Sequence, residues 1–580
     1  MNMLRTRYIL ACLAVLLTAG AYGQNKKVTF TGAGRLLLNS DRVHGDLFDS
    51  AAVATPDTVT AQRELGGYAL FDLGFDIRPN AQTEIRAITR INSDLDGFWG
   101  AGIAFTVREL YARGLIKGAV RYKIGDIDTK ATPYTLWNNQ RDLGVNTASA
   151  LNVFGDVIDY EMFYRDNMWR QQGADLDFAL MMPKLVDELQ FRGMISKNRN
   201  TDYFSLPDRM FALGQLTAVN GDWGEVGYTY ASMFDIAASA QFSESASTTD
   251  VHTVRFDVGL PGDRGLRLGG ELGRSGTRYE ETFGAPADTS GSFFDVNLKA
   301  QLPNSPWQVR LGYRMVESGF RSPGAQSRQL NVGRTPDAFS FLTNQEIARP
   351  MGIGDILKDP TLYNLTFGPE LQNYDPSLEN AEPYGVATPN RQGVTVGLAM
   401  EQDSSVLRTV NIEGGLLTEV QGRGIDAYRN FAFARVRAGI VQGPVSASAA
   451  FQFQQTNRDG LTGQGEGLDG IGQVALNSIF AELGVAYEIA PKMDIVGAFL
   501  FFAADGNEYT AIRNSFNQIT DYREMTVDRA ETLSALGLRY RFSDTVQLTV
   551  QQHWRGYEDA IDAQLNYNMN QFVVLYNMFF

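Results

Sequence analysis

The feature that most constrains this chain is an alternation of apolar with polar or charged residues over stretches of about ten positions. The stretch from Trp307 to Val316 reads WQVRLGYRMV, and the stretches 294–302 and 536–542 follow the same pattern. A period of two is that of an extended strand, whose successive side chains point to opposite faces. A strand in the dry core of a soluble protein would not carry a charge at nearly every second position of one face. The pattern therefore predicts strands with hydrocarbon on one side and water on the other.

Period-two alternation bounded by turn residues predicts 22 strands along the whole chain. They are expected at 27–38, 66–78, 81–93, 104–113, 117–126, 172–182, 188–197, 210–219, 223–236, 251–260, 264–274, 291–302, 306–318, 392–403, 406–421, 430–440, 444–455, 476–489, 492–503, 528–542, 545–557 and 567–580. Most of them have the ~9–11 residues that a tilted strand needs to cross a bilayer.

The connections between these strands alternate between short and long. Every second one is a tight turn, such as Pro79-Asn80 or Ser543-Asp544, and the longest are 127–171 and 319–391. This is the pattern of short periplasmic turns and long extracellular loops. We predict an all-β chain in which residues 24–580 form a single large antiparallel transmembrane β-barrel of about 22 strands. A soluble sandwich or propeller is the alternative. A propeller would show a repeat of ~40 residues, and the sequence shows none.

The segment QFVVLYNMFF, residues 571–580, alternates in the same way and ends in an aromatic residue. It resembles the closing strand of bacterial outer-membrane β-barrel proteins. The resemblance implies an assembly signal that the barrel-assembly machinery reads, formed by Phe572, Val574, Tyr576, Met578 and Phe580. It also implies residence in the bacterial outer membrane, with outer-membrane lipid around the barrel.

Residues 1–23 have the form of a secretory signal peptide. Arg5 and Arg7 precede a short apolar run, and Ala21-Tyr22-Gly23 offers a small-residue cleavage site near Gly23. Cleavage would remove the only cysteine, Cys12, and with it thiol chemistry. Without Arg5 and Arg7, 49 basic residues face 66 acidic ones, a net charge of −17. A chain this acidic is not expected to bind nucleic acid.

Charged residues on the polar face of the strands are the candidates for the lumen wall. These lumen-facing candidates are Arg86, Arg90, Arg121, Arg255, Arg267, Glu271, Asp295, Lys299, Arg310, Arg314, Arg539 and Arg541. They could create a transverse field in a pore, or form cross-strand ion pairs in a solvated wall. The inward positions also include the basic residues Lys123 and Arg192 and the acidic residues Asp72, Asp76, Glu84, Asp175, Asp177, Asp257, Glu413, Glu482 and Glu488. Over this whole set both signs are nearly balanced, so we expect no strong ion selectivity from the wall alone. Trp223, Trp307, Phe542 and Tyr557 are expected in the aromatic girdles at the membrane interfaces.

The two longest connections contain many apolar and aromatic residues. Eight of the 19 prolines lie in 319–391, and 127–171 contains Tyr134 and Trp137 among seven large aromatic residues. A disordered loop would not need so many apolar residues. They are expected to fill the lumen, to pack on each other, or to bind other outer-membrane proteins.

A porin-like channel for small solutes is the function that this fold most often serves, by analogy alone. The alternative is a structural or accessory barrel in an outer-membrane secretion or assembly complex. The three histidines, His44, His252 and His553, are not spaced with a nucleophile, so an enzyme is not expected. No cofactor and no metal site is predicted.

Overall fold

The computed structural model describes most of the chain from Val28 to Phe580. The described residues are 28–45, 63–94, 103–137, 148, 150, 171–182, 186–205, 207–242, 246–259, 265–279, 288–326, 376–422, 427–460, 472–513 and 519–580. The predicted signal peptide lies outside them, as do parts of both long connections.

The fold consists of 22 wall strands and one short additional strand. The wall strands are β1 (Val28–His44), β2 (Arg63–Asn80), β3 (Thr83–Asp94), β4 (Ile103–Ile116), β5 (Val120–Ile127), β6 (Gln171–Met181), β7 (Glu188–Arg199), β8 (Asp208–Asn220), β9 (Gly224–Ile236), β10 (Ser247–Gly259), β11 (Leu266–Tyr279), β12 (Thr289–Gln301), β13 (Trp307–Val316), β15 (Arg391–Glu401), β16 (Leu407–Thr418), β17 (Asn430–Gln442), β18 (Val445–Arg458), β19 (Val474–Ala490), β20 (Met493–Arg513), β21 (Ile519–Ser543), β22 (Val546–Asp559) and β23 (Tyr567–Phe579). The additional strand is β14 (Pro383–Val386), and two single 3-10 turns are η5 (Ala237–Ser239) and η7 (Ala563–Leu565). Among the described residues, no helix is long and apolar enough to cross a membrane.

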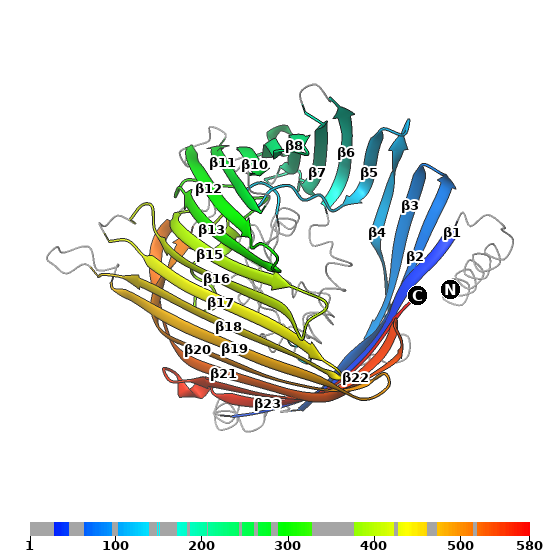
Figure 1. Cartoon of the computed structure of the whole chain (residues 1–580), viewed down its shortest axis with the longest axis vertical. Coiled ribbons are helices and arrows are strands. Elements are labelled where there is room, and N and C mark those ends of the chain that lie inside the picture. The colour runs from blue at the N-terminus through cyan, green and yellow to red at the C-terminus, as the bar shows by residue number, and fades with distance from the viewer. Residues whose placement is uncertain are drawn as a thin grey trace.

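Every wall strand pairs antiparallel with its neighbours in the chain, and β13 pairs directly with β15. The ring closes because β1 pairs with β23, from Ala33 opposite Phe579 to His44 opposite Asn568. Figure 1 shows the strands following one another around this ring in chain order. The predicted single antiparallel barrel of 22 strands is therefore confirmed.

The seam between the first and last strands is closed by Phe580. Its backbone N–H donates to the Gly32 carbonyl at 3.1 Å, and the Gly32 N–H donates to the Phe580 carbonyl at 2.9 Å. A Cβ on Gly32 would lie 2.4 Å from both the Phe580 ring and the Asp72 carbonyl, so only glycine fits beneath that ring. The Phe580 ring also stacks on Phe71, with centroids 5.8 Å apart.

One predicted connection is mostly strand. The stretch 504–527 was expected to be a loop, but β20 extends to Arg513 and β21 begins at Ile519. Their pairing continues to Arg513 opposite Ile519, whereas the pairing of β20 with β19 ends at Asn507. The two strands therefore continue beyond their other neighbours as a hairpin. The backbone hydrogen bonds of this hairpin join its own two strands. Such a hairpin does not need the alternating apolar residues of a strand that faces lipid, so the sequence pattern did not predict it.

Candidate functional site

Residues 128–137, which follow β5, pack against the wall on the inner side of the barrel (Figure 1). Thr132 Oγ1 donates a hydrogen bond of 2.6 Å to Glu271 on β11. Tyr134 Oη donates one of 2.7 Å to Asp295 on β12. The segment keeps its own fold through the Ala131 N–H, which donates to the Leu136 carbonyl at 2.9 Å. Segment 128–137 is thus a folded turn fixed to β11 and β12. It also contacts β6 and β7, where Thr129 donates to Asp175 and Arg192 donates to the Lys130 carbonyl.

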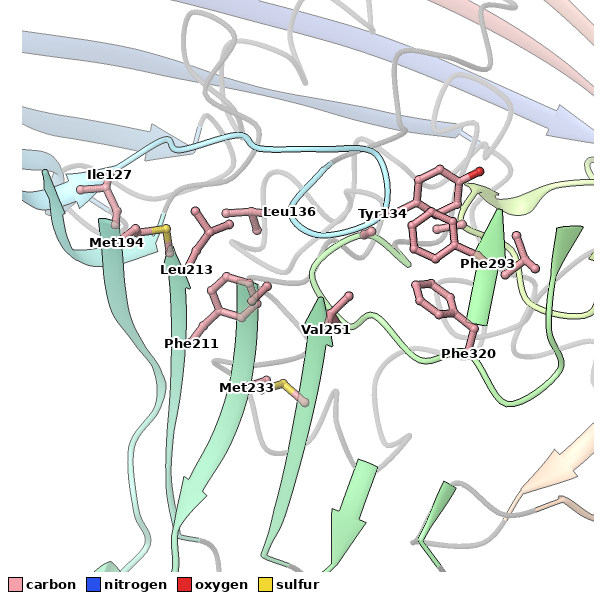
Figure 2. Packing of buried hydrophobic residues seen from close by; sticks show 14 residues of the cluster. Ile127, Tyr134, Leu136, Met194, Phe211, Leu213, Met233, Val251, Phe293 and Phe320 are labelled. Atoms are coloured by element: carbon pink, nitrogen blue, oxygen red, sulfur yellow. The ribbon is translucent and has the colours of Figure 1, made fainter. Parts of the chain in front are cut away.

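An apolar cluster lies beneath segment 128–137, and Figure 2 shows it. The Tyr134 ring stacks on Phe293 with centroids 3.9 Å apart, and Phe293 meets Phe320 edge to face at 4.9 Å. The buried members of the cluster are Ile127, Tyr134, Leu136, Met194, Phe211, Leu213, Ala231, Met233, Val251, Phe293, Val316, Phe320, Ala325 and Ala387. The inner wall is therefore apolar from β7 to β13 at this level, and the segment covers it.

Burial raises the pKa of Tyr134 well above its ordinary value, and the adjacent Asp295 carboxylate raises it further. The phenol is therefore neutral at physiological pH and acts as a donor to Asp295.

The two long connections are attached to each other through residues 317–326, which follow β13. The Trp137 N–H donates to the Gly324 carbonyl at 2.9 Å. Ser322 Oγ donates to the Tyr134 carbonyl at 2.7 Å, and Gln326 Nε2 donates to the Ala387 carbonyl at 3.0 Å. Of the outcomes expected for these connections, the described residues display packing on each other, together with contacts to the inner wall. Filling of the lumen and binding of other outer-membrane proteins stay predictions.

Residues 376–390, which include β14, are fixed to the wall by charged and polar groups. Arg435 on β17 contacts Glu379 at 2.6 Å and Glu382 at 3.3 Å, and Arg314 on β13 also pairs with Glu382. Asn380 Nδ2 donates to Glu508 on β20 at 2.7 Å. All these groups are buried. Segment 376–390 is therefore held by ion pairs and amide hydrogen bonds.

The pKa of Glu382 reflects two opposing effects. Burial raises it, but the guanidinium groups of Arg314 and Arg435 lower it more, so the net shift is downward. Glu382 is a carboxylate at physiological pH, and its charge is what both arginines contact.

The connection after β5 also reaches the opposite part of the wall. The Ala148 N–H donates to Glu482 Oε1 on β19 at 2.6 Å, and the Ala148 side chain is buried. Strands β6–β13 and β15–β18 separate β5 from β19 in one direction around the ring, and β20–β23 with β1–β4 separate them in the other. The described residues of this single connection therefore contact β11, β12 and β19, which lie far apart around the ring.

A hollow of about 770 Å³ lies on the inner side near the short turns of β2–β8. Its charged lining residues are Arg78, Glu84, Arg113, Arg121, Lys123, Asp128, Asp175, Asp177, Glu188 and Arg192. The inner segments contact the parts of β12, β13 and β17 nearest the long connections, for example at Phe293, Arg314 and Arg435. The hollow extends toward the short turns, and Asp128 and Thr129 at the start of segment 128–137 also line it.

The candidate lumen residues fall into two groups. Most are paired across strands: Arg86 with Asp76 at 3.1 Å, Arg90 with Asp72 at 2.8 Å, Arg121 with Asp177 at 2.5 Å, Arg255 with Glu225 at 2.8 Å, Arg267 with Asp257 at 2.6 Å, Lys299 with Asp257 at 3.4 Å, and Arg539 and Arg541 with Asp494 at 2.9 and 3.0 Å. Glu271, Asp295 and Arg314 instead contact the inner segments, and Arg310 is exposed. The wall thus has an ion-paired part and a part that holds the long connections.

Several buried charged residues were not among the candidates. Arg435 lies at a polar position of the predicted strand 430–440, so the alternation that identified the other candidates could also have identified it. Arg209, which pairs with Asp235 at 2.6 Å, and Arg429, which contacts Glu508 at 2.7 Å, lie one residue before the predicted strand starts. The sequence signal for those two was present, but the strand boundaries excluded them.

The two faces of the wall differ in the expected way. Large apolar side chains such as Leu311, Leu298 and Leu536 are exposed on the face opposite the inner segments. Gln571, Leu575 and Asn577 on β23 are buried on the inner face, and Phe572 and Phe580 are exposed on the outer one. A closed barrel with an apolar outer surface and a charged inner one needs lipid around it. The chain is a β-barrel of the bacterial outer-membrane type.

Solved outer-membrane structures match this barrel over almost its entire length. The P pilus usher (PapC) translocation pore is 9% identical, with 94% of this chain and 99% of that chain covered and a TM-score of 0.38. OccK2 (OpdF) of Pseudomonas aeruginosa is 9% identical, with 96% and 99% covered and a TM-score of 0.31. The siderophore receptor PirA of Pseudomonas aeruginosa is 7% identical, with 95% and 80% covered and a TM-score of 0.35. Likeness at this level concerns the fold alone. No family model and no curated protein matches the sequence.

The aromatic residues of the barrel ends require one correction. Trp223 and Phe542 are exposed near the short turns, as a girdle requires. Tyr557 was expected in the opposite girdle, but it lies opposite Glu531, on the face where Glu531 pairs with Arg555 at 3.0 Å. It therefore faces inward, because its position in the alternation is that of Arg555, while Trp554 is exposed on the outer face.

The described residues contain no group of three or more histidine, cysteine or carboxylate side chains that could hold a metal ion.

Proposed function

We propose that this barrel is an outer-membrane porin-like channel for small solutes. The observation that carries the proposal is the division of the lumen along its axis. The described inner segments lie against the wall near the long connections, whereas a charged hollow of about 770 Å³ lies toward the short turns. A narrowed part followed by a wider, water-accessible chamber is the arrangement that a selective channel needs, because the solute meets the wall in only one short region.

This proposal includes the location and the environment of the chain. The outer membrane is reached by export through the predicted signal peptide and by recognition of the last strand, with Phe580 at its end. The barrel passes its solute without changing it chemically. Other outer-membrane proteins can contact it through the connections 127–171 and 319–391.

The alternative is an accessory barrel whose lumen remains closed, and one observation favours it. Segment 376–390 is held by buried ion pairs, and the other long connection contacts Glu482 through Ala148 as well as β11 and β12. A barrel sealed in this way would serve another protein as a scaffold.

Excision of residues 334–382 distinguishes the two functions. In a channel, the deletion removes Glu379 and Glu382 and widens the narrow part, so the conductance in planar bilayers and the uptake of small sugars by liposomes should both rise. In an accessory barrel, conductance should stay near zero and a co-purifying partner should be released. Heat-modifiable gel mobility checks that the deleted protein still forms a barrel. Unchanged conductance with no lost partner would contradict both functions.

A further inference from the structure

The charged hollow near the short turns contains as many basic as acidic side chains, but three of its arginines are more exposed than the carboxylates that they contact. Its lining includes five basic and five acidic side chains. The side chains of Arg121, Arg78 and Arg113 are 73, 67 and 53% exposed, whereas their carboxylate partners Asp177 and Glu84 are 26 and 15% exposed. Water or a solute in the hollow therefore meets guanidinium groups first, with the carboxylates behind them.

The pairing within the hollow leaves cationic capacity. Glu84 is shared by two arginines, Arg113 at 2.8 Å and Arg78 at 3.4 Å. Arg121 lines the hollow and contacts Asp177 through Nε. Among the residues that the structure describes, its two terminal guanidinium nitrogens have no acceptor. A guanidinium has five N–H donors and binds a carboxylate or phosphate through two of them at once.

The strand register brings like charges together at the same place. Arg113 on β4 lies directly opposite Lys123 on β5, where Cβ atoms are about 5 Å apart. Asp177 on β6, in contrast, lies between two opposite charges in the register, Arg121 on one side and Arg192 on the other. Like charges directly opposite each other destabilise a sheet. A mobile anion in the hollow would offset that repulsion.

Two acidic residues limit the size of this cationic surface. Asp128 lies 2.9 Å from Lys123 and is exposed, and Glu188 lines the hollow near the turn before β7. The cationic surface is therefore confined to Arg78, Arg113 and Arg121, on neighbouring parts of β2, β4 and β5. A surface of three guanidinium groups fits a small solute with one or two anionic groups.

We infer that the hollow is a binding site for small organic anions carrying carboxylate or phosphate groups, with Arg78, Arg113 and Arg121 as the residues that bind them. This deepens the proposed channel function and rests on it for the direction of passage. It differs from the expectation that the wall alone gives no strong ion selectivity. That expectation compared the numbers of basic and acidic residues and did not consider which of them are exposed.

Equilibrium binding tests the inference without requiring a conducting channel. Glutarate serves as the dianionic probe and 1,4-diaminobutane as the dicationic one, titrated calorimetrically into the whole purified barrel in neutral detergent at low salt. We expect glutarate to bind and the diamine not to bind. The double substitution Arg113→Gln with Arg121→Gln should weaken glutarate binding on the order of tenfold or more, because each arginine contributes charge-assisted hydrogen bonds.

A matched control is the double substitution Arg267→Gln with Arg278→Gln. Both arginines are exposed and paired with an aspartate, but they do not line the hollow. The control should bind glutarate as the parent does, and heat-modifiable mobility should show both variants folded. Equal weakening in both variants, unchanged binding in the first, or equally tight binding of the diamine would overturn the inference.

The reversal potential in planar bilayers under a KCl gradient separates this inference from the proposed function. The parent should favour chloride, and the Arg113 and Arg121 variant should favour it less. Glutarate binding in a barrel that passes no current would contradict the channel but support the site. Current without an arginine-dependent chloride preference would contradict the site but support the channel.

Discussion

Segments 128–137 and 376–390 both lie on the inner wall, but different forces hold them. Segment 128–137 places Tyr134 and Leu136 on an apolar patch that includes Phe293. Segment 376–390 places Glu379 and Glu382 on arginines. Apolar contact favours burial whatever the pH, whereas an ion pair depends on the protonation of its carboxylate. The first segment is therefore expected to be a permanent part of the wall, and the second can be released.

This difference teaches that the filling of a lumen can have two roles in one barrel. Removing segment 128–137 would expose buried apolar side chains to water, which costs free energy in proportion to their area. Releasing segment 376–390 would expose charged and amide groups that water solvates well, together with the small buried side chains Ala381 and Ala387. The energetic penalty for moving it is then the loss of specific pairs and of a smaller apolar contact.

The largest expected effect is that of Phe293→Ala on stability. Phe293 is buried and contacts both Tyr134 and Phe320, so its loss leaves a cavity between two segments and the wall. The free energy of unfolding should fall by ~3–5 kcal/mol, measured by urea titration in liposomes. Phe204→Ala is the control, because Phe204 is exposed and should change stability by ~0.5 kcal/mol or less. Equal losses at both positions would mean that the apolar patch does not hold segment 128–137.

Arg435→Gln should affect passage more than stability. The substitution leaves Glu379 without its 2.6 Å ion pair and Glu382 with Arg314 alone. An unpaired buried carboxylate is costly, and segment 376–390 relieves that cost by moving into water. Single-channel conductance should rise about twofold or more, on the assumption that the segment narrows the lumen. Arg435→Lys, which keeps the charge, should restore much of the parent value. A loss of folded barrel without any conductance change would show that the segment cannot be released.

The two segments should respond to opposite extremes of pH. The pKa of Glu382 is lowered in the folded protein, so its contribution is present at neutral pH and is lost as the pH falls through that lowered pKa. The pKa of Tyr134 is raised. Its contribution is present below pH ~10 and is lost as the pH rises above the ordinary tyrosine range.

Conductance and urea stability measured from strong acid to strong alkali check these directions. Strong acid should raise conductance reversibly, and the acid response should be reduced in Glu382→Gln, which cannot titrate at that position. Alkali should lower the free energy of unfolding, and Tyr134→Phe should remove part of that decrease. An acid response that is unaltered by Glu382→Gln would place the sensitive group elsewhere.

The smallest effect is expected for a wall pair that touches neither segment. Arg267 and Asp257 are 2.6 Å apart but partly exposed, and such pairs contribute about 0–1 kcal/mol. Arg267→Gln should therefore change stability by less than ~1 kcal/mol and leave the opening of segment 376–390 unchanged. A conductance change like that of Arg435→Gln would remove the distinction between wall pairs and segment pairs.

Much of the barrel could be predicted because a strand shows its two faces locally. Each predicted strand overlaps an observed one, and the alternation 307–316 already separates Leu311 on the outer face from Arg314 on the inner one. What holds the inner segments could not be predicted. Tyr134 meets Phe293 and Asp295 only after the sheet has curved round, and Glu382 meets Arg435 only after a connection has folded back. Those contacts depend on closure of the ring, which leaves no periodic signal in the sequence.

The exposure of the hollow could not be predicted for a related reason. The sequence shows that Arg113 and Glu84 share a face, but it does not show that a long arginine reaches past a shorter carboxylate into the lumen. Strand boundaries caused two further errors, since Arg209 and the hairpin beyond Asn507 lie at the edges of the expected elements. Tyr557 was assigned to a girdle by its place near the strand end, although its position in the alternation is an inward one.

The seam between β1 and β23 determines the order in which this protein can acquire its structure. Arg35 Nε donates to Asn577 Oδ1 at 2.7 Å across a sequence separation of 542 residues. During synthesis, the edge of β1 that pairs with β23 therefore has no hydrogen-bonding partner until nearly all of the chain has been made. An open edge invites pairing with other chains. This topology therefore requires that the open edge of β1 be protected until the sheet is complete. The hydrogen bonds between Gly32 and Phe580 form when the barrel closes, and the edge needs no protection after that step.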